Sequence, residues 1–124
     1  MNLTLPFPPT TNNLFRNVRG KGRVPTKNYE QWMKRALGEL MIQRPARLTG
    51  YVSVDLAFGI PDKRRRDLDN LMKAPLDCLV KFGVVEDDSK IIRISARWLG
   101  LAVPQTYLGV KPATLTGPLF KGAA

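Results

Sequence analysis

Residues 27–43 restrict the fold of this 124-residue chain more than any other segment. Apolar side chains recur there at spacings of three and four residues, which is typical of one face of an α-helix. Thr26 can cap the start of this helix, and Pro45 prevents its continuation. The helix must bury its stripe against a second layer, which the rest of the chain has to supply. The stripe consists of Tyr29, Trp32, Met33, Ala36, Leu37, Leu40 and Met41.

The second layer is predicted to be a β-sheet. Residues 51–60 and 92–98 alternate between apolar and polar side chains, as half-buried strands do. Residues 3–7 predict a short edge strand ended by two prolines, and 105–110 predict a further strand. A second helix is expected within 71–82, beginning just before Pro75 because proline is disruptive deeper in a helix. This order predicts an α+β single domain in which a mixed sheet packs against two main helices.

The remaining segments carry many glycines, prolines or charges. The length of the chain predicts one domain, which we expect to span residues 1–110. Residues 111–124 contain several glycines and prolines and are expected to form a loosely ordered tail. Residues 10–25 carry four cations and few apolar side chains, which predicts a mobile basic loop.

The composition excludes several kinds of active site. The chain has no histidine, which rules out histidine bases, histidine metal ligands and nucleophiles activated by histidine. Its single cysteine, Cys78, excludes internal disulfides and cysteine-rich zinc sites and is typical of a reducing cytoplasm. No apolar run approaches the roughly 20 residues of a membrane span, so we expect a cytoplasmic protein with no membrane partner.

The net charge is strongly positive. Twenty lysines and arginines against ten acidic residues give +10 and an isoelectric point near 10.3. Such a balance is typical of polyanion binding, most often of nucleic acid. A ribosomal-type RNA binder and a basic protein without any partner remain alternatives at this point.

The acidic residues are concentrated in one part of the chain. Seven of the ten lie between Asp62 and Asp88, where they would repel a polyanion unless a cation intervened. Asp67 and Asp69 share one side of an extended backbone, so both can meet one metal ion. Hard oxygen ligands of this kind favour Mg²⁺. Asp87 and Asp88 can reach the same end of the sheet if their strand neighbours 51–60. Helix capping is the alternative for Asp69. A solvated turn is the alternative for Asp87 and Asp88.

Two groups of cations are candidates for DNA contact. The run Lys63, Arg64, Arg65 and Arg66 directly precedes the carboxylates, and arginine binds phosphate bidentately. The second group, in the basic loop, is Arg16, Arg19, Lys21 and Arg23. The alternative for both groups is a solvated surface. Lys73 lies four residues after Asp69. It is a candidate for a role at the phosphate, and the alternative is an exposed helical ion pair with Asp69.

Together these residues resemble the RusA family of Holliday junction resolvases from bacteria and their phages. The similarity covers residues 3–110, and its specific part runs from Arg65-Arg66-Asp67-Leu68-Asp69-Asn70 through Lys73 to Asp87-Asp88. It implies a homodimer that cuts branched DNA, namely four-way junctions, by paired symmetric nicks with Mg²⁺, Mn²⁺ being an alternative. It further implies that Asp67, Asp69 and Asp88 are essential carboxylates, Lys73 an essential lysine and Asp87 a neighbouring acid. The competing class is a non-catalytic basic nucleic-acid-binding module.

Overall fold

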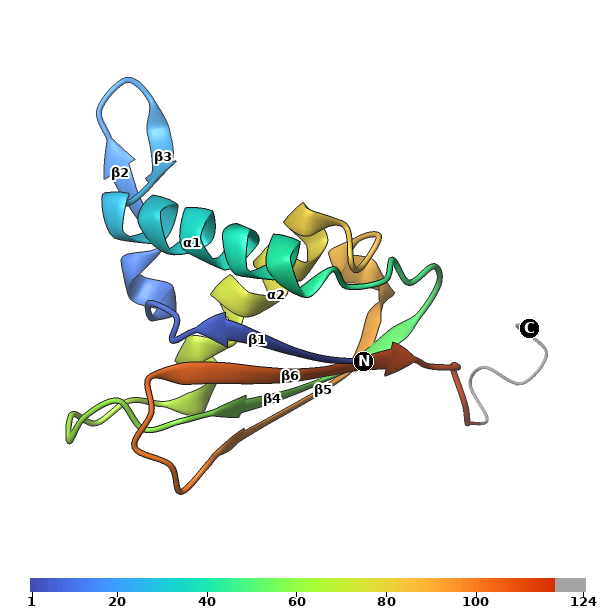
Figure 1. The fold of residues 1–124 in the computed structure, drawn as a ribbon. Coiled ribbons are helices and arrows are strands. Elements are labelled where there is room, and N and C mark those ends of the chain that lie inside the picture. Colours follow the sequence, from blue (N-terminus) through green and yellow to red (C-terminus); the bar gives the residue numbers. More distant parts are fainter. Residues whose placement is uncertain (118–124) are drawn as a thin grey trace.

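The computed structural model describes residues 1–117, in which two helices lie on one face of a four-stranded sheet (Figure 1). This arrangement confirms the predicted α+β class. The other face of the sheet carries no helix (Figure 1). The elements are β1 (Asn2–Pro6), η1 (Thr11–Asn13), β2 (Phe15–Val18), β3 (Gly22–Pro25), α1 (Lys27–Gln43), β4 (Val52–Phe58), η2 (Leu68–Leu71), α2 (Lys73–Phe82), η3 (Asp88–Lys90), β5 (Ile91–Trp98) and β6 (Gln105–Pro112), where η marks a 3-10 helix.

The sheet is mixed, with the strand order β1-β6-β4-β5. β4 runs parallel to β5 and antiparallel to β6, and β6 is also antiparallel to β1. β1 is therefore an edge strand, as its prolines predict. The helix-facing residues of β4 are fully buried, and Phe58 at its end packs edge-on against Phe7 and Trp98. These side chains form the centre of the core beneath the helices.

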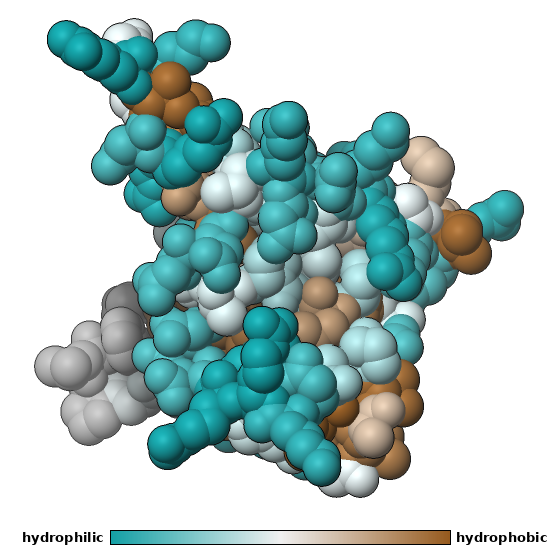
Figure 2. Space-filling model, turned by 90° about the vertical axis from the view of Figure 1, so that its left-hand side faces the viewer, coloured by the Kyte–Doolittle hydropathy of each residue, from teal (hydrophilic) through white to brown (hydrophobic). Residues whose placement is uncertain are grey.

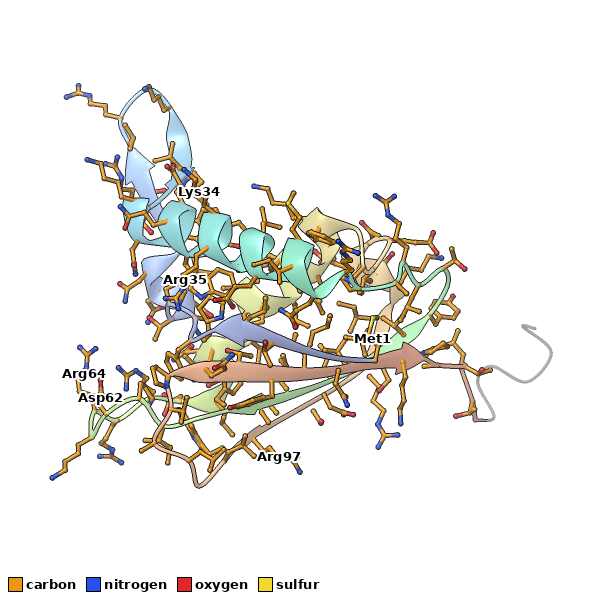
Figure 3. The ribbon with its side chains drawn as sticks, in the orientation of Figure 1. Met1, Lys34, Arg35, Asp62, Arg64 and Arg97 are labelled. Carbon is orange, nitrogen blue, oxygen red and sulfur yellow. The ribbon has the colours of Figure 1, made fainter. Side chains whose placement is uncertain are left out.

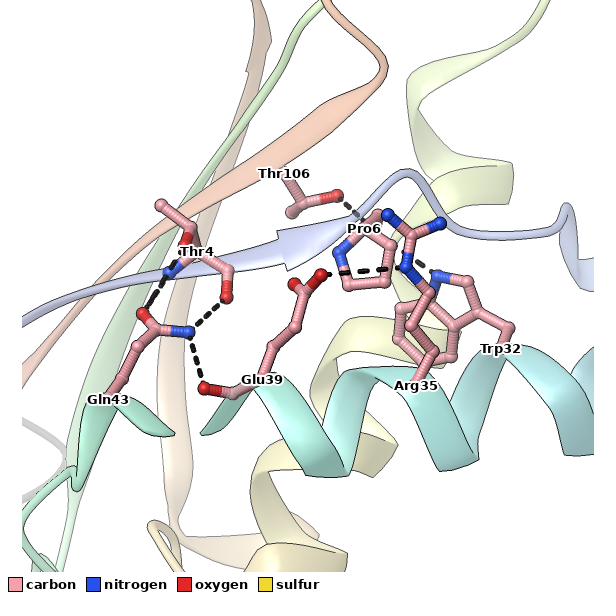
Figure 4. Close-up of polar contacts among 7 residues, drawn as sticks. All are labelled: Thr4, Pro6, Trp32, Arg35, Glu39, Gln43 and Thr106. Atoms are coloured by element: carbon pink, nitrogen blue, oxygen red, sulfur yellow. Dashed lines mark hydrogen bonds and ion pairs between the residues drawn. The ribbon is translucent and has the colours of Figure 1, made fainter. Parts of the chain in front are cut away.

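α1 has the bounds that its sequence predicts. The Thr26 hydroxyl accepts a hydrogen bond from the backbone N–H of Tyr29, which caps the first turn. Along its length the helix is fastened to β1 (Figure 4). The Trp32 indole N–H donates to the carbonyl of Pro6 at 3.2 Å, and the Gln43 side-chain amide bonds both backbone groups of Thr4. These contacts fix the position of the helix along the edge strand.

α2 begins at Lys73, so Pro75 occupies its first turn. A missing N–H costs nothing there, because the first N–H groups of a helix have no partner within the helix. The expected turn-like entry is the 3-10 helix η2. Gly83 ends α2 in the left-handed conformation, with φ of 97°, and its N–H donates to Leu79 and Val80. Cys78 is buried in α2, and burial raises the pKa of its thiol to about 12.

Residues 10–25 differ from the sequence-based expectation of a loop. They form η1 and the β2–β3 hairpin, which projects beyond the start of α1 (Figure 1). The connection is a tight turn in which the Lys21 N–H donates to Val18, while Gly20 and Gly22 take positive φ. Phe15 packs edge-on against Tyr29, and the Arg23 guanidinium lies 4.2 Å from the centre of the Phe15 ring. These aromatic contacts hold the base of the hairpin against α1.

The C-terminal strand is longer than expected. β6 continues to Pro112, so the first two residues of the predicted tail belong to the sheet. The Ala113 N–H then donates to the Tyr51 carbonyl, which holds the chain beside the start of β4. Of the predicted tail, residues 118–124 lie outside the described part of the chain.

Candidate active site

The loop that follows β4 carries the basic run, and its arginines are not equivalent. The Arg66 guanidinium forms two short hydrogen bonds to the Asp62 carboxylate, at 2.6 and 2.9 Å. It also lies 5.4 Å from the centre of the Phe7 ring, and only 12% of its side chain is exposed. The bonds from Arg66 hold the pKa of Asp62 well below its usual range. Arg66 and Asp62 therefore close the loop, while Lys63, Arg64 and Arg65 are exposed.

Asp67 and Asp69 come next, around the start of η2. Both side chains are exposed, and neither forms a hydrogen bond or ion pair within residues 1–117. Asp67 occupies the N-cap position of η2 without a side-chain cap bond, and α2 likewise begins without one. Helix capping, the alternative that the sequence allows for this segment, is therefore not what these carboxylates do.

Asp87 and Asp88, in the segment before β5, differ in their contacts. The Asp87 carboxylate accepts from the backbone N–H of Ser89 at 3.0 Å and from its hydroxyl at 2.6 Å, which caps η3. The Ser89 hydroxyl and N–H together lower the pKa of Asp87. Asp88 is exposed and, in the described part of the chain, has no side-chain partner. Asp87 thus shapes the turn and leaves Asp88 available.

Few carboxylates lack a partner. Six of the ten acidic side chains are held by a hydrogen bond or an ion pair within residues 1–117: Glu39, Asp55, Asp62, Asp77, Glu86 and Asp87. The other four are Glu30, in the first turn of α1, and Asp67, Asp69 and Asp88. Within residues 1–117, the three aspartates that resemble essential carboxylates are therefore three of the four acidic side chains without a partner.

The sheet separates these three aspartates into two groups. Asp67 and Asp69 follow the C-terminal end of β4, whereas Asp88 precedes the N-terminal end of β5. Because β4 and β5 run parallel, with Val52 opposite Ile91 and Phe58 opposite Trp98, the two groups lie at opposite ends of the strand pair. The expectation that they meet at one end of the sheet is wrong for a single chain. Within residues 1–117, no three acidic or cysteine side chains are close enough to hold a metal ion.

Lys73 has a different partner from the one its spacing suggested. Its ammonium lies 3.0 Å from the Asp77 carboxylate, one turn further along α2, and it forms no ion pair with Asp69. The other oxygen of Asp77 accepts a hydrogen bond from the Tyr29 hydroxyl at 3.1 Å. Burial and the neighbouring Asp77 charge raise the pKa of Tyr29, so this phenol stays protonated. Asp77, itself bonded by Tyr29, thus fixes the ammonium of Lys73 in the first turn of α2, and only the i, i+4 spacing of Lys73 and Asp77 signalled this in the sequence.

The cations of the hairpin and of the loop lie on one side of the molecule. Asp62 and Arg64 mark the loop in Figure 3. The hairpin projects on the same side of the molecule, beyond the start of α1. Viewed from this side, hydrophilic side chains extend from both places (Figure 2). η2 lies between them, because the Thr11 hydroxyl of η1 donates to the Asn70 carbonyl at 3.1 Å. Asp67 and Asp69 thus come directly after one group of exposed cations, and their segment contacts η1, which leads into the hairpin that carries the other group: Lys63, Arg64 and Arg65 in the loop, and Arg16, Arg19, Lys21 and Arg23 in the hairpin.

Comparison with known proteins identifies relatives of the chain. Residues 6–111 match the family model described as endodeoxyribonuclease RusA. The chain is 34% identical over 96 residues to the crossover junction endodeoxyribonuclease RusA of Escherichia coli strain K12, which covers 73% of this chain and 75% of that protein. A protein with the same description from Enterobacteria phage 82 is 33% identical over 96 residues, with the same coverage. None of the helices in residues 1–117 is long and apolar enough to cross a membrane.

Proposed function

The chain belongs to the RusA family of endodeoxyribonucleases, and on this basis we propose that it resolves four-way DNA junctions by paired, metal-dependent nicks. The observation that carries the proposal is the set of unpartnered carboxylates Asp67, Asp69 and Asp88 in a chain of charge +10. Cations beside two of these carboxylates offset their repulsion of DNA. The enzyme acts in the cytoplasm of a bacterium or a phage-infected cell, where its substrate is found.

The active site is completed by a second copy of the chain. Within residues 1–117 of one chain the three aspartates do not meet, since Asp67 and Asp69 lie at the opposite end of the β4–β5 pair from Asp88. A two-fold dimer places residue i of one copy against residue j of the other, and j against i. Such a dimer brings Asp67 and Asp69 of each copy to Asp88 of the other. Two equivalent sites result, which matches the two nicks that a four-way junction requires.

Carboxylates and a lysine perform the chemistry, because the chain has no histidine. When bound, Mg²⁺ or Mn²⁺ supplies an activated water and neutralises charge on the phosphate. Asp67 and Asp69 offer hard oxygen ligands from one short segment. Lys73, held by Asp77 at 3.0 Å in the helical turn that follows these carboxylates, supplies a positive charge that stabilises the charge developing on the phosphate. The hairpin and loop cations bind the phosphates on either side.

A cleavage assay on synthetic four-way junctions and matched linear duplex tests the activity. We expect Mg²⁺-dependent nicks at symmetric positions in junctions only. Asp67→Asn, Asp69→Asn and Asp88→Asn should abolish cleavage while junction binding without metal is retained or strengthened, because each removes a negative charge near DNA. Glu39→Gln, which removes a carboxylate paired with Arg35 on the flank of α1, is the matched control and should cut normally. Junction binding without cleavage under any divalent cation would instead indicate a non-catalytic module.

A subunit-mixing experiment tests the shared site. Asp67→Asn and Asp88→Asn homodimers are each inactive, and the two are mixed under conditions that allow exchange. In a mixed dimer one site carries both substitutions and the other carries neither, so single nicks in junctions should return. If each site were built within one chain, both sites of the mixed dimer would be broken and no activity would return. Sedimentation of a monomer with full resolving activity would likewise contradict the dimer.

A further inference from the structure

Three side chains form a row across the sheet on its open face. Ser53 in β4 stands directly opposite Arg93 in β5 and Lys111 in β6. An irregularity in the β4–β5 pairing, between Val52 and Ser53, aligns Arg93 with Ser53. Arg97, on the same face four residues along β5, points away from the helices (Figure 3). Directly opposed side chains in neighbouring strands have Cβ atoms about 5 Å apart, so two cations flank one hydroxyl.

The Ser53 hydroxyl has no partner. Its residue is only 3% exposed, and within residues 1–117 the side-chain oxygen forms no hydrogen bond. Buried hydroxyls in native proteins are almost always bonded, because an unmade bond leaves the cost of desolvation uncompensated. The position of Ser53 therefore calls for a polar ligand that the protein itself does not supply.

A cavity of about 520 Å³ lies over this row. Ser53, Arg93 and Lys111 line it together with residues 112–116. Neither Arg93 nor Lys111 pairs with an acid in the part of the chain that the structure describes. Asp55, the next residue of β4 on this face, already accepts from the Ser95 hydroxyl at 2.6 Å. Within residues 1–117 the cavity thus combines two cations that have no acidic partner with the Ser53 hydroxyl, which is the chemistry that recognises a phosphate.

We propose that Arg93, Ser53 and Lys111 form a second phosphate-binding site, which takes a backbone phosphate of the DNA. The site lies where β4 and β5 begin, the end of the strand pair that also carries Asp88. The choice of DNA as the source of the phosphate rests on the proposed function. In the shared active site, this row holds the DNA strand on the Asp88 side, while the loop and hairpin hold it on the Asp67 side.

Binding measurements test the site apart from catalysis. The affinity of the full chain for a fluorescent four-way junction and for linear duplex is measured in EDTA over a range of NaCl concentrations. Arg93→Gln and Lys111→Gln should each weaken binding about fivefold to tenfold at 0.1 M salt and reduce the slope of log affinity against log salt by about one. Lys34→Gln, on the outer face of α1, is the control and should change neither (Figure 3). Equal behaviour of the Arg93 and Lys34 variants overturns the proposal.

Inorganic phosphate distinguishes the possible sources of the ligand. In heteronuclear NMR spectra, phosphate should shift the amide signals of Ser53 and Arg93, and Ser53→Ala should weaken this response without lowering the melting temperature. Phosphate binding with unchanged DNA affinity in the Arg93 variant overturns DNA as the source. Absence of any phosphate response, or a Ser53→Ala protein that is less stable but binds phosphate normally, overturns the site. The binding and phosphate measurements contain no divalent metal, so they do not depend on cleavage. The cleavage results of the aspartate variants therefore test only the proposed function.

Discussion

Gly59 offers a sharp test of the packing where β4 leads into the loop that carries the basic run. A Cβ atom at this position would lie 1.9 Å from the Val103 carbonyl oxygen and 3.0 Å from its carbon. The neighbouring backbone bonds are short: the Gly59 N–H donates to Gln105 at 2.9 Å and the Ile60 N–H to Leu101 at 2.7 Å. The connection between β5 and β6 therefore closes over Gly59, and only a residue without a side chain fits beneath it.

The expected cost of Gly59→Ala follows from these contacts. Ordinary carbon–oxygen contacts are about 3.3 Å long, so relieving the clash requires the backbone to move by more than about 1 Å. Overpacking of this kind costs about 1–3 kcal/mol. Weakening the two backbone hydrogen bonds adds about 1 kcal/mol each. We expect the free energy of unfolding to fall by about 3–5 kcal/mol, or roughly 12–20 °C in melting temperature for a domain of this size.

Gly38→Ala is the matched control, because it makes the same substitution where there is space. Gly38 lies at an exposed position in α1, with no atom within 4 Å of an added Cβ. Alanine should stabilise the helix there by about 0.5–1 kcal/mol. Thermal and urea unfolding followed by circular dichroism measure both variants. A Gly59→Ala protein as stable as the wild type, or a shift in the same direction for both variants, would refute the packing argument.

Three further outcomes are expected. Lys73→Ala should give a stable protein that binds junctions but cuts them at least about a hundredfold more slowly, because the lost charge acts on the phosphate. Normal cleavage would show that Lys73 serves only in its ion pair with Asp77, which is worth about 0.2–0.5 kcal/mol. Cys78, whose pKa burial raises to about 12, should resist a thiol reagent at pH 8 in the folded protein and react at once in urea; rapid labelling of the native protein would show that α2 opens. Ser89→Ala should raise the pKa of Asp87, measured by carboxyl NMR, because its largest stabilising donor is gone; an unchanged titration would remove Ser89 from that role.

Local patterns in the sequence predicted most of the elements. α1 has the predicted bounds because its apolar stripe, the Thr26 cap and Pro45 all act within a few residues of one another. The entry to α2 was predictable for the same reason, since Pro75 allows only a first-turn position. The hairpin was missed because its aromatic support comes from Tyr29, outside the segment, and few apolar residues mark its strands.

The arrangement of the site depends on contacts that spacing does not encode. Alternation predicts a strand, but it does not say whether two strands run parallel, and the parallel β4–β5 pairing is what separates Asp67 from Asp88. The choice of Asp77 over Asp69 as the partner of Lys73 depends on which residues have entered the regular helix. The proposed contribution of a second copy to the site likewise cannot be predicted from residue spacing within one chain.

The position of β6 has a consequence for how the protein is made. The last strand in the sequence lies between β1 and β4, and β1 pairs with no other strand of the sheet within residues 1–117. While the ribosome synthesises the first hundred residues, β1 therefore has no strand to pair with, and the core that Leu108 and Val110 help to close stays open to water. Local helices can form early, but the sheet can be completed only after β6 has emerged from the ribosome. A nascent chain stalled before Gln105 should accordingly remain sensitive to protease, whereas one that exposes residues up to Pro112 should become resistant in a single step.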